Sequence, residues 1–151
     1  MRLTTFTDYS LRVLMYLAAV PGRRATIGEI ARAFDISENH LMKVVHALGK
    51  AGLLANVRGR GGGLALARAP QAINVGAVVR ATEGEAIPAE CFERAASTCD
   101  LLRVCQLRGV LAEAVAAFHA VLDRYTLADL VQNRQALARV LRIDVRSALP
   151  A

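Results

Sequence analysis

All three cysteines of this 151-residue chain lie in one short stretch, CFERAASTCDLLRVC. Seven residues separate Cys91 from Cys99, and five separate Cys99 from Cys105. This spacing lacks the close Cys-x-x-Cys pair that most structural zinc sites contain. Three thiolates can hold three corners of an iron–sulfur cluster, which takes thiolate ligands at its iron atoms. The spacing alone therefore favours a cluster and leaves zinc, a redox switch and unliganded buried cysteines open.

A complete [4Fe–4S] site needs a fourth ligand, and the chain has no fourth cysteine. The last iron would take a histidine, a carboxylate, a small molecule or a residue from another chain. The N-terminus lacks a secretory signal pattern, and no apolar run approaches the roughly 20 residues that span a bilayer. We therefore expect a cytoplasmic protein with no membrane partner, in which cysteine clusters indicate metal binding or catalysis before disulfides.

The positive charge of the chain is concentrated in its N-terminal half. Residues 1–70 contain ten basic and four acidic side chains, a balance of +6, whereas residues 71–151 contain nine of each. A polyanion such as DNA is a natural partner for the first half, although a solvated basic surface has the same composition. Aromatic residues are few and tryptophan is absent, so leucine, valine and alanine must build the core, which favours helices.

Two helices are predicted before residue 36. Residues 6–20 have apolar side chains at helical spacing, and Pro21-Gly22 ends that helix. Thr26 and Glu29 have the spacing of a capping box, which predicts the start of a second helix.

A third helix, SENHLMKVVHALGKAG, is expected with Ser37 as its N-cap and Gly52 at its left-handed C-terminal end. Two short helices joined by a tight turn indicate a helix-turn-helix. Next come the apolar segments LLANV and LALA, separated by RGRGGG, whose glycines suit a hairpin tip. A nucleotide phosphate loop is the competing interpretation, but no Walker lysine–serine pair follows. Residues 1–83 are therefore predicted to form a winged helix-turn-helix DNA-binding domain.

The C-terminal half is predicted to contain a dimerisation helix. NVGAVVRAT is a fourth helix with Asn74 as its N-cap, and residues 84–106 form a cysteine-containing loop that would bind the cluster. The longest periodic segment follows, over residues 102–124. Its apolar stripe consists of Leu107, Val110, Leu111, Ala114, Val115, Phe118, Val121 and Leu122. A long helix beyond a domain that already has its own core favours a homodimer seam over core packing, so residues 107–151 are assigned to dimerisation and short C-terminal helices, the first capped by Thr126.

The candidate DNA contacts follow from how helix-turn-helix proteins bind, with the start of the second helix in the major groove. There Asn39 can pair bidentately with adenine, and Lys43 can reach guanine or a phosphate. On the wing, Arg58 and Arg60 can enter an adjacent minor groove. The candidate set is Arg12, Thr26, Ser37, Glu38, Asn39, His40, Lys43, Arg58 and Arg60. Of these, Thr26 and Ser37 are equally well explained as helix caps.

Five segments resemble one family of regulators. They are MRLTTFTDYSLR, SENHLMKVVHALGKAG, VRGRGGGLAL, the three-cysteine segment and YTLADLV, in this order over essentially the whole chain. Together they resemble the NsrR repressors, which sense nitric oxide and belong to a winged-helix family that includes the iron–sulfur regulator IscR. The fold class expected is mainly α, with a small β-hairpin and a long C-terminal dimerisation helix.

The resemblance implies a homodimer that binds a double-stranded DNA operator and an iron–sulfur cluster. The cluster expected is [4Fe–4S], with [2Fe–2S] as the alternative, held by Cys91, Cys99, Cys105 and Asp8 of the partner subunit. Taken alone, Asp8 is most simply a favourable charge near a helix start. IscR-like members use a histidine three residues after the last cysteine; here that residue is Arg108, which cannot ligate.

The function implied is a transcriptional repressor whose cluster senses nitric oxide and which controls genes for nitric oxide detoxification. A winged-helix regulator of iron–sulfur or redox status, and a structural zinc-binding module, are the alternatives. We expect no enzyme, because no nucleophile–base pair stands on a recognisable motif.

Overall fold

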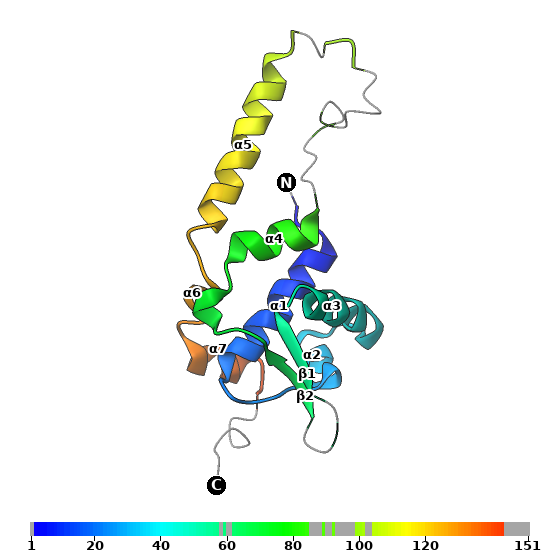
Figure 1. Cartoon of the computed structure of the whole chain (residues 1–151), viewed down its shortest axis with the longest axis vertical. Helices are drawn as coiled ribbons and strands as arrows, with labels where there is room; N and C mark the ends of the chain where they lie inside the picture. The colour runs from blue at the N-terminus through cyan, green and yellow to red at the C-terminus, as the bar shows by residue number, and fades with distance from the viewer. Residues whose placement is uncertain are drawn as a thin grey trace.

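A computed structural model of the chain describes residues 2–57, 59, 62–84, 89, 92, 99–101 and 104–143. The elements are α1 (Thr5–Ala19), α2 (Ile27–Phe34), α3 (Glu38–Lys50), β1 (Leu54–Val57), β2 (Gly63–Leu66), the 3-10 helix η1 (Pro70–Ala72), α4 (Val75–Glu83), α5 (Gln106–Leu122), α6 (Leu127–Leu130) and α7 (Arg134–Val140). The described part is mostly helical with one antiparallel hairpin, β1–β2 (Figure 1). The predicted fold class is confirmed, and α5 lies within the periodic segment expected over residues 102–124 and contains the whole predicted apolar stripe.

Local signals explain the helix-turn-helix. The Thr26 hydroxyl accepts a hydrogen bond from the Glu29 N–H at 3.2 Å, and the Glu29 carboxylate accepts one from the Thr26 N–H at 2.6 Å, which confirms the capping box. Asp35 ends α2 in the left-handed conformation with φ 53° and so turns the chain toward α3. Ser37 stands at the N-cap position of α3, but its side chain makes no capping hydrogen bond, so the predicted cap is wrong in that respect.

The β1–β2 hairpin, which forms the wing, is attached to the helices through the backbone of Ala25, just before α2. β1 and β2 pair with Leu54 opposite Leu66. Leu64 of β2 then exchanges two hydrogen bonds with Ala25, at 2.8 and 3.0 Å, just before α2. Gly63 permits this approach, because its φ is 147° and a Cβ there would lie 3.0 Å from the Ala25 carbonyl oxygen.

The core is built around α1, which packs against α3, α4, α6 and α7. The apolar spacing over residues 6–20 predicts a face of Leu11, Leu14, Met15 and Ala18; Leu14 and Ala18 are buried, and Leu11 and Met15 are half-buried against the core. Because α1 is covered on several sides, Val13, Tyr16 and Leu17 are buried as well. The helices α6 and α7, with the residues that directly follow each, contribute Leu127, Val131, Ala138, Leu141 and Ile143 to the same core. These two helices therefore return to the core formed around α1 and do not continue the line of α5.

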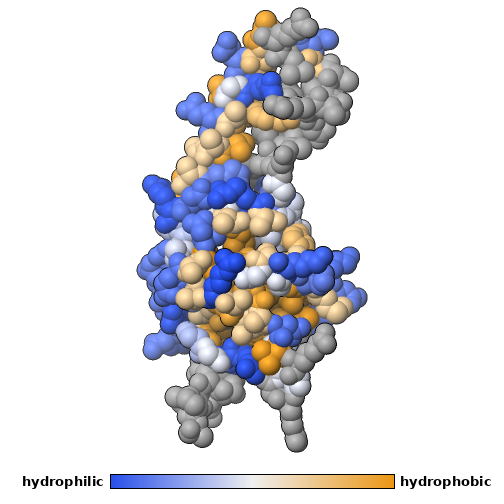
Figure 2. All heavy atoms as spheres, in the orientation of Figure 1, coloured by the Kyte–Doolittle hydropathy of each residue, from blue (hydrophilic) through white to orange (hydrophobic). Residues whose placement is uncertain are grey.

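The helix α5 projects away from this core (Figure 1) and packs against α4. No residue of α5 is buried within the chain. Its large apolar side chains Leu107 and Val110 are each 61% exposed, and Val121 is 45% exposed. Apolar and hydrophilic residues both reach the surface of this extension (Figure 2). The stripe predicted for α5 is therefore outside the core of a single chain. No helix within the described ranges is long and apolar enough to cross a membrane.

A pH-dependent contribution to stability is expected from Glu29. Its carboxylate pairs with the Arg23 guanidinium at 2.5 Å. Burial opposes its ionisation, but hydrogen bonds from Thr26 and Arg23 outweigh burial and hold the pKa of Glu29 below its ordinary value. A carboxyl group with a depressed pKa stabilises the fold fully above its unfolded pKa and loses that contribution as the pH falls through its folded pKa. Glu29→Gln should therefore lower the free energy of unfolding by about 1 kcal/mol at pH 7.

This gap between wild type and Glu29→Gln should narrow once the pH falls below the ordinary pKa of a glutamic acid, about 4.3, and close as the pH passes the lower pKa of folded Glu29. Urea unfolding at pH 7 and in acid would measure it. As a control, the exposed Glu113 changed to glutamine should alter the free energy of unfolding by less than about 0.5 kcal/mol at either pH. A Glu29→Gln gap that persists in acid would contradict the ionic explanation.

Candidate nucleic-acid interface and metal centre

The start of α3 presents five of the candidate DNA contacts to solvent. All are exposed: Ser37, Glu38, Asn39, His40 and Lys43. The opposite face of α3 is buried through Leu41, Val44 and Leu48, so the orientation of the helix is fixed by the core. The Ser37 hydroxyl is not used as a cap, which leaves it available to a ligand such as a phosphate oxygen. The geometry is that of a recognition helix whose first turns face solvent.

Arg58 and Arg60 of the wing lie outside the described residues. Their neighbours Gly59 and Gly62 are described, and the Gly62 N–H donates to the Gly59 carbonyl oxygen at 2.9 Å. Gly59 has φ 98°, a conformation that favours glycine. The predicted tip therefore falls between β1 and β2.

The structure gives Arg12 and Thr26 partners within the chain. The Arg12 guanidinium pairs with the Asp8 carboxylate at 3.0 Å, one helical turn away, and lies 5.7 Å from the centre of the Phe34 ring on α2. The Thr26 hydroxyl belongs to the capping box with Glu29. Any phosphate contact by these two residues would have to share or replace those interactions.

Of the three cysteines, the structure describes Cys99 and Cys105, whose thiols are free and half-exposed. Cys91 lies outside the described residues. Cys105 occupies the N-cap position of α5 but makes no capping hydrogen bond, so helix formation does not engage its sulfur. It borders a hollow of about 450 Å³, whose wall includes Arg108 with its guanidinium 5.8 Å from the Phe92 ring centre. Among the described residues of one chain, no group of three or more histidine, cysteine and acidic side chains could hold a metal.

Asp8 lies in the first part of α1, which is anchored to the end of α4. The Thr4 N–H and hydroxyl donate to the Glu83 carboxylate at 2.9 to 3.0 Å, and the Thr4 hydroxyl also caps α1 by accepting from the Thr7 N–H. Burial opposes ionisation of Glu83, but hydrogen bonds from Thr7 and Thr4 outweigh it and lower its pKa. The start of α1 is thereby fixed to Glu83, which directly precedes the predicted cluster-binding loop of residues 84–106.

A contact between α1 and α3 was not predicted. The rings of Tyr9 and His40 lie 6.4 Å apart, with 41° between their planes. Tyr9 directly follows Asp8, so the residue next to the candidate ligand contacts α3 through His40. No sequence spacing indicates this contact, because it depends on how α1 crosses α3.

Residues 3–133 match the Rrf2 family, described as iron-dependent transcriptional regulators. The chain belongs to the Rrf2 family. Among Rrf2-like relatives, the HTH-type transcriptional regulator NsrR of Bacillus subtilis (strain 168) is 49% identical over 144 residues, or 95% of this chain and 99% of that protein. NsrR of Geobacillus kaustophilus (strain HTA426) is 49% identical over 143 residues, which cover 94% of this chain and 97% of that protein.

Solved structures of similar proteins agree with this assignment. IscR of T. potens is 28% identical, has a TM-score of 0.71 and matches over 88% of both chains. The oxidised form of CymR from Staphylococcus aureus is 27% identical, has a TM-score of 0.69 and matches over 87% of this chain and 96% of that one. The Rrf2 chain described here is thus a winged-helix transcriptional regulator and not an enzyme, and the resemblance to NsrR is confirmed.

Proposed function

We propose that this Rrf2 regulator is a homodimeric repressor that binds a double-stranded DNA operator, responds to nitric oxide through an iron–sulfur cluster and controls genes for nitric oxide detoxification. The observation that carries the proposal is identity of 49% to a protein named NsrR across almost the full length of both chains. In this proposal, residues 1–83 read DNA in the cytoplasm, residues 84–106 hold the cluster and α5 forms the dimer seam.

Cys91, Cys99, Cys105 and Asp8 of the partner subunit would hold the cluster, of the [4Fe–4S] type. The donor set fits, since the two described cysteines are free and half-exposed, and thiolates are the ligands that iron–sulfur clusters require. The Asp8 carboxylate is half-exposed and so can meet a group outside its own chain. When bound, the cluster would supply iron atoms at which nitric oxide reacts.

Asp8 and Arg12 connect the proposed cluster site to the helix-turn-helix. Asp8 pairs with Arg12 in this chain, so a second role as a ligand competes with that ion pair. Arg12 in turn lies against Phe34 of α2. With the neighbouring Tyr9 against His40 of α3, a shift of the first turns of α1 reaches both helices of the helix-turn-helix. The first turns of α1 therefore have two alternative sets of partners. A ligand that favours one set over the other can change the affinity for DNA.

Anaerobic purification followed by iron, sulfide and zinc analysis and absorbance spectroscopy tests this function. We expect iron and acid-labile sulfide, visible absorbance that bleaches with nitric oxide, and loss of operator binding on the same titration. A colourless zinc protein would instead support a structural metal module. Absorbance that changes with oxygen or oxidants, but not with nitric oxide, would favour a regulator of iron–sulfur or redox status, a class to which the likeness to IscR points.

The wing is expected to bind DNA through charge, not sequence. Arg60→Ala should weaken binding to all duplexes and reduce the slope of log affinity against log salt by about 1, because one phosphate-directed charge is lost. Asn39→Ala, on the exposed start of α3, should instead discriminate less between operator and mutated duplexes at an almost unchanged salt slope. Fluorescence anisotropy across a salt series measures both, and an Arg60→Ala protein with the wild-type slope would remove the wing from the interface.

A further inference from the structure

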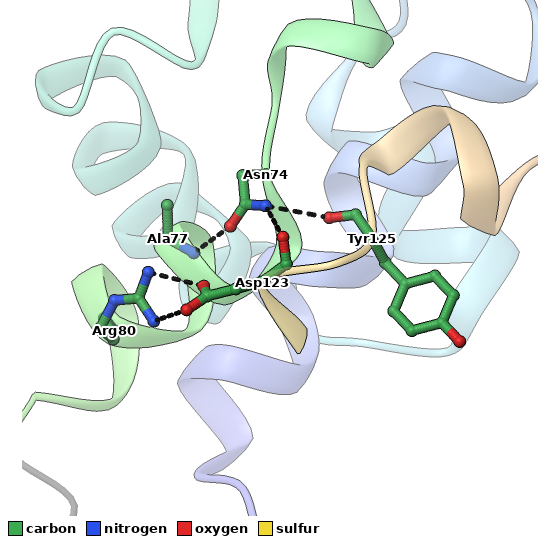
Figure 3. A network of polar contacts seen from close by, with 5 residues as sticks. All are labelled: Asn74, Ala77, Arg80, Asp123 and Tyr125. Carbon is green, nitrogen blue, oxygen red and sulfur yellow. Dashed lines mark hydrogen bonds and ion pairs between the residues drawn. The ribbon is translucent and has the colours of Figure 1, made fainter. Parts of the chain in front are cut away.

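The turn that follows α5 is tied to the start of α4 by hydrogen bonds (Figure 3). The Asn74 amide nitrogen donates to the carbonyl oxygens of Asp123 at 2.7 Å and Tyr125 at 3.3 Å, while its side-chain oxygen caps α4. The Val75 N–H donates to the same Tyr125 carbonyl oxygen at 3.0 Å. One of these bonds joins backbone to backbone and the other two join the Asn74 side chain to backbone, so the end of α5 and the beginning of α4 are coupled.

A bidentate ion pair adds a directional contact further along α4, at Arg80. The two terminal nitrogens of Arg80 donate to the two carboxylate oxygens of Asp123 at 3.0 and 2.7 Å (Figure 3). Two parallel hydrogen bonds between planar groups fix orientation as well as distance. The hydrogen bonds from Arg80 also hold the pKa of Asp123 below its ordinary value.

Gly76 permits this close approach. A Cβ at residue 76 would collide with the Asp123 carboxylate and would lie 3.0 Å from the Asp123 backbone nitrogen. Glycine is a poor helix former, yet it stands inside α4 where the contact leaves no room for a side chain. The geometry of the turn therefore depends on Gly76 as well as on the polar side chains.

This turn sets the direction of the dimer helix relative to the DNA reader. α5 packs against α4, and α4 packs against α1 in the core. With its 17 residues, α5 is about 25 Å long, so a change of about 10° at the turn moves its far end by about 4 Å. That displacement is on the order of one base-pair rise, about 3.4 Å. Small rotations here would change the separation of two recognition helices across a twofold axis.

We propose that Asn74, Gly76, Arg80 and Asp123 form an elbow lock that selects the separation between operator half-sites. The inference rests on the proposed function only in taking α5 as the dimer seam of a DNA-binding dimer. These four are positioning residues, because they act on DNA through the angle between α4 and α5. The Arg80–Asp123 pair acts through geometry and adds little to global stability, since the two side chains are 47% and 42% exposed and such pairs stabilise a fold little.

The test uses a palindromic duplex selected from random DNA by the wild-type protein. Affinity is measured by anisotropy for this duplex and for versions with one or two base pairs inserted or deleted between the half-sites. The wild type should lose at least about tenfold in affinity at each altered spacing, because the two α3 helices of the dimer can no longer bind both half-sites at once. Arg80→Gln and Gly76→Ala should reduce that preference to less than about threefold or move its optimum, with dimer mass and metal content unchanged.

Two controls distinguish a geometric role of the elbow lock from an effect of net charge and from a folding defect. Arg124→Gln removes one positive charge from an exposed residue beside Asp123, outside the lock, and should keep the wild-type spacing preference. Exchanging the pair, as Arg80→Asp with Asp123→Arg, should restore the preference that either single change reduces. Folded dimers of Arg80→Gln with the wild-type spacing profile, or with affinity lowered equally at every spacing, would overturn the proposal. A wild-type dimer that binds its duplex but lacks iron or a nitric oxide response would refute the proposed function and leave the elbow lock to be judged by the spacing series.

Discussion

Replacing Cys105 by serine is expected to remove iron from the purified protein and to weaken operator binding by roughly 100-fold, near the upper end of coupling free energies between sites. The thiolate of Cys105 would be one of three that hold the cluster, and a serine hydroxyl does not replace it as an iron–sulfur ligand at neutral pH. Iron and sulfide assays of oxygen-free preparations, together with anisotropy on the operator, measure the two effects.

The local structure makes this substitution a clean probe. Cys105 stands at the N-cap of α5 and its side chain makes no capping hydrogen bond. Serine is a preferred N-cap, so the variant should begin α5 at least as well, with a gain of up to about 1 kcal/mol. Lost DNA binding could not then be attributed to a lost helix.

Arg108→Gln is the matched control for Cys105→Ser. Arg108 borders the same hollow and lies against Phe92, but its guanidinium cannot ligate iron. We expect wild-type iron content from this variant. A Cys105→Ser protein that holds as much iron as Arg108→Gln would take Cys105 out of the ligand set.

Features of the fold that depend on neighbours in sequence were predictable. The capping box of Thr26 and Glu29 and the cap at Asn74 are decided by residues three positions apart, and the structure confirms both. Ser37 shows the limit of such signals, since the same residue type at the same helix position makes no cap bond. A cap preference states what a side chain can do, whereas the packing of α3 against the core decides its final orientation.

Contacts between distant segments were not predictable. Thr4 and Glu83 are 79 residues apart, and neither has a spacing that indicates the other. The need for glycine at residue 76 follows from Asp123, which reaches it only after the chain has passed through the cysteine segment and α5.

The candidate metal centre also has a part that the sequence predicts and a part that it does not. The residue types and spacing of the three cysteines indicate thiolate ligation from the sequence alone, and the structure shows that Cys99 and Cys105 are free and half-exposed. The fourth ligand proposed, Asp8, comes from another copy of the chain, so no spacing within one sequence could identify it. The family resemblance supplied that assignment, and the Asp8–Arg12 ion pair shows what ligation must displace.

Replacing Val110 by glutamate is expected to convert the protein to monomers and to weaken operator binding by roughly 100-fold or more, because each half-site is then bound without the other. Val110 is 61% exposed in the single chain and belongs to the apolar stripe of α5. A second copy that covers this stripe would bury the carboxylate in an apolar contact, which is strongly unfavourable for an unpaired charge. Analytical ultracentrifugation gives the mass, and anisotropy gives the affinity.

Ala116→Glu adds the same charge on the opposite face of α5, at a residue that is also exposed. This variant should remain a dimer with wild-type operator affinity, since alanine and glutamate are both good helix formers. A monomer also lacks Asp8 of the partner subunit. Val110→Glu should therefore lose the response of operator binding to nitric oxide as well as the dimeric state. If Val110→Glu remained dimeric, the seam of the homodimer would lie elsewhere than on this stripe, and α5 would carry its apolar side chains for another partner.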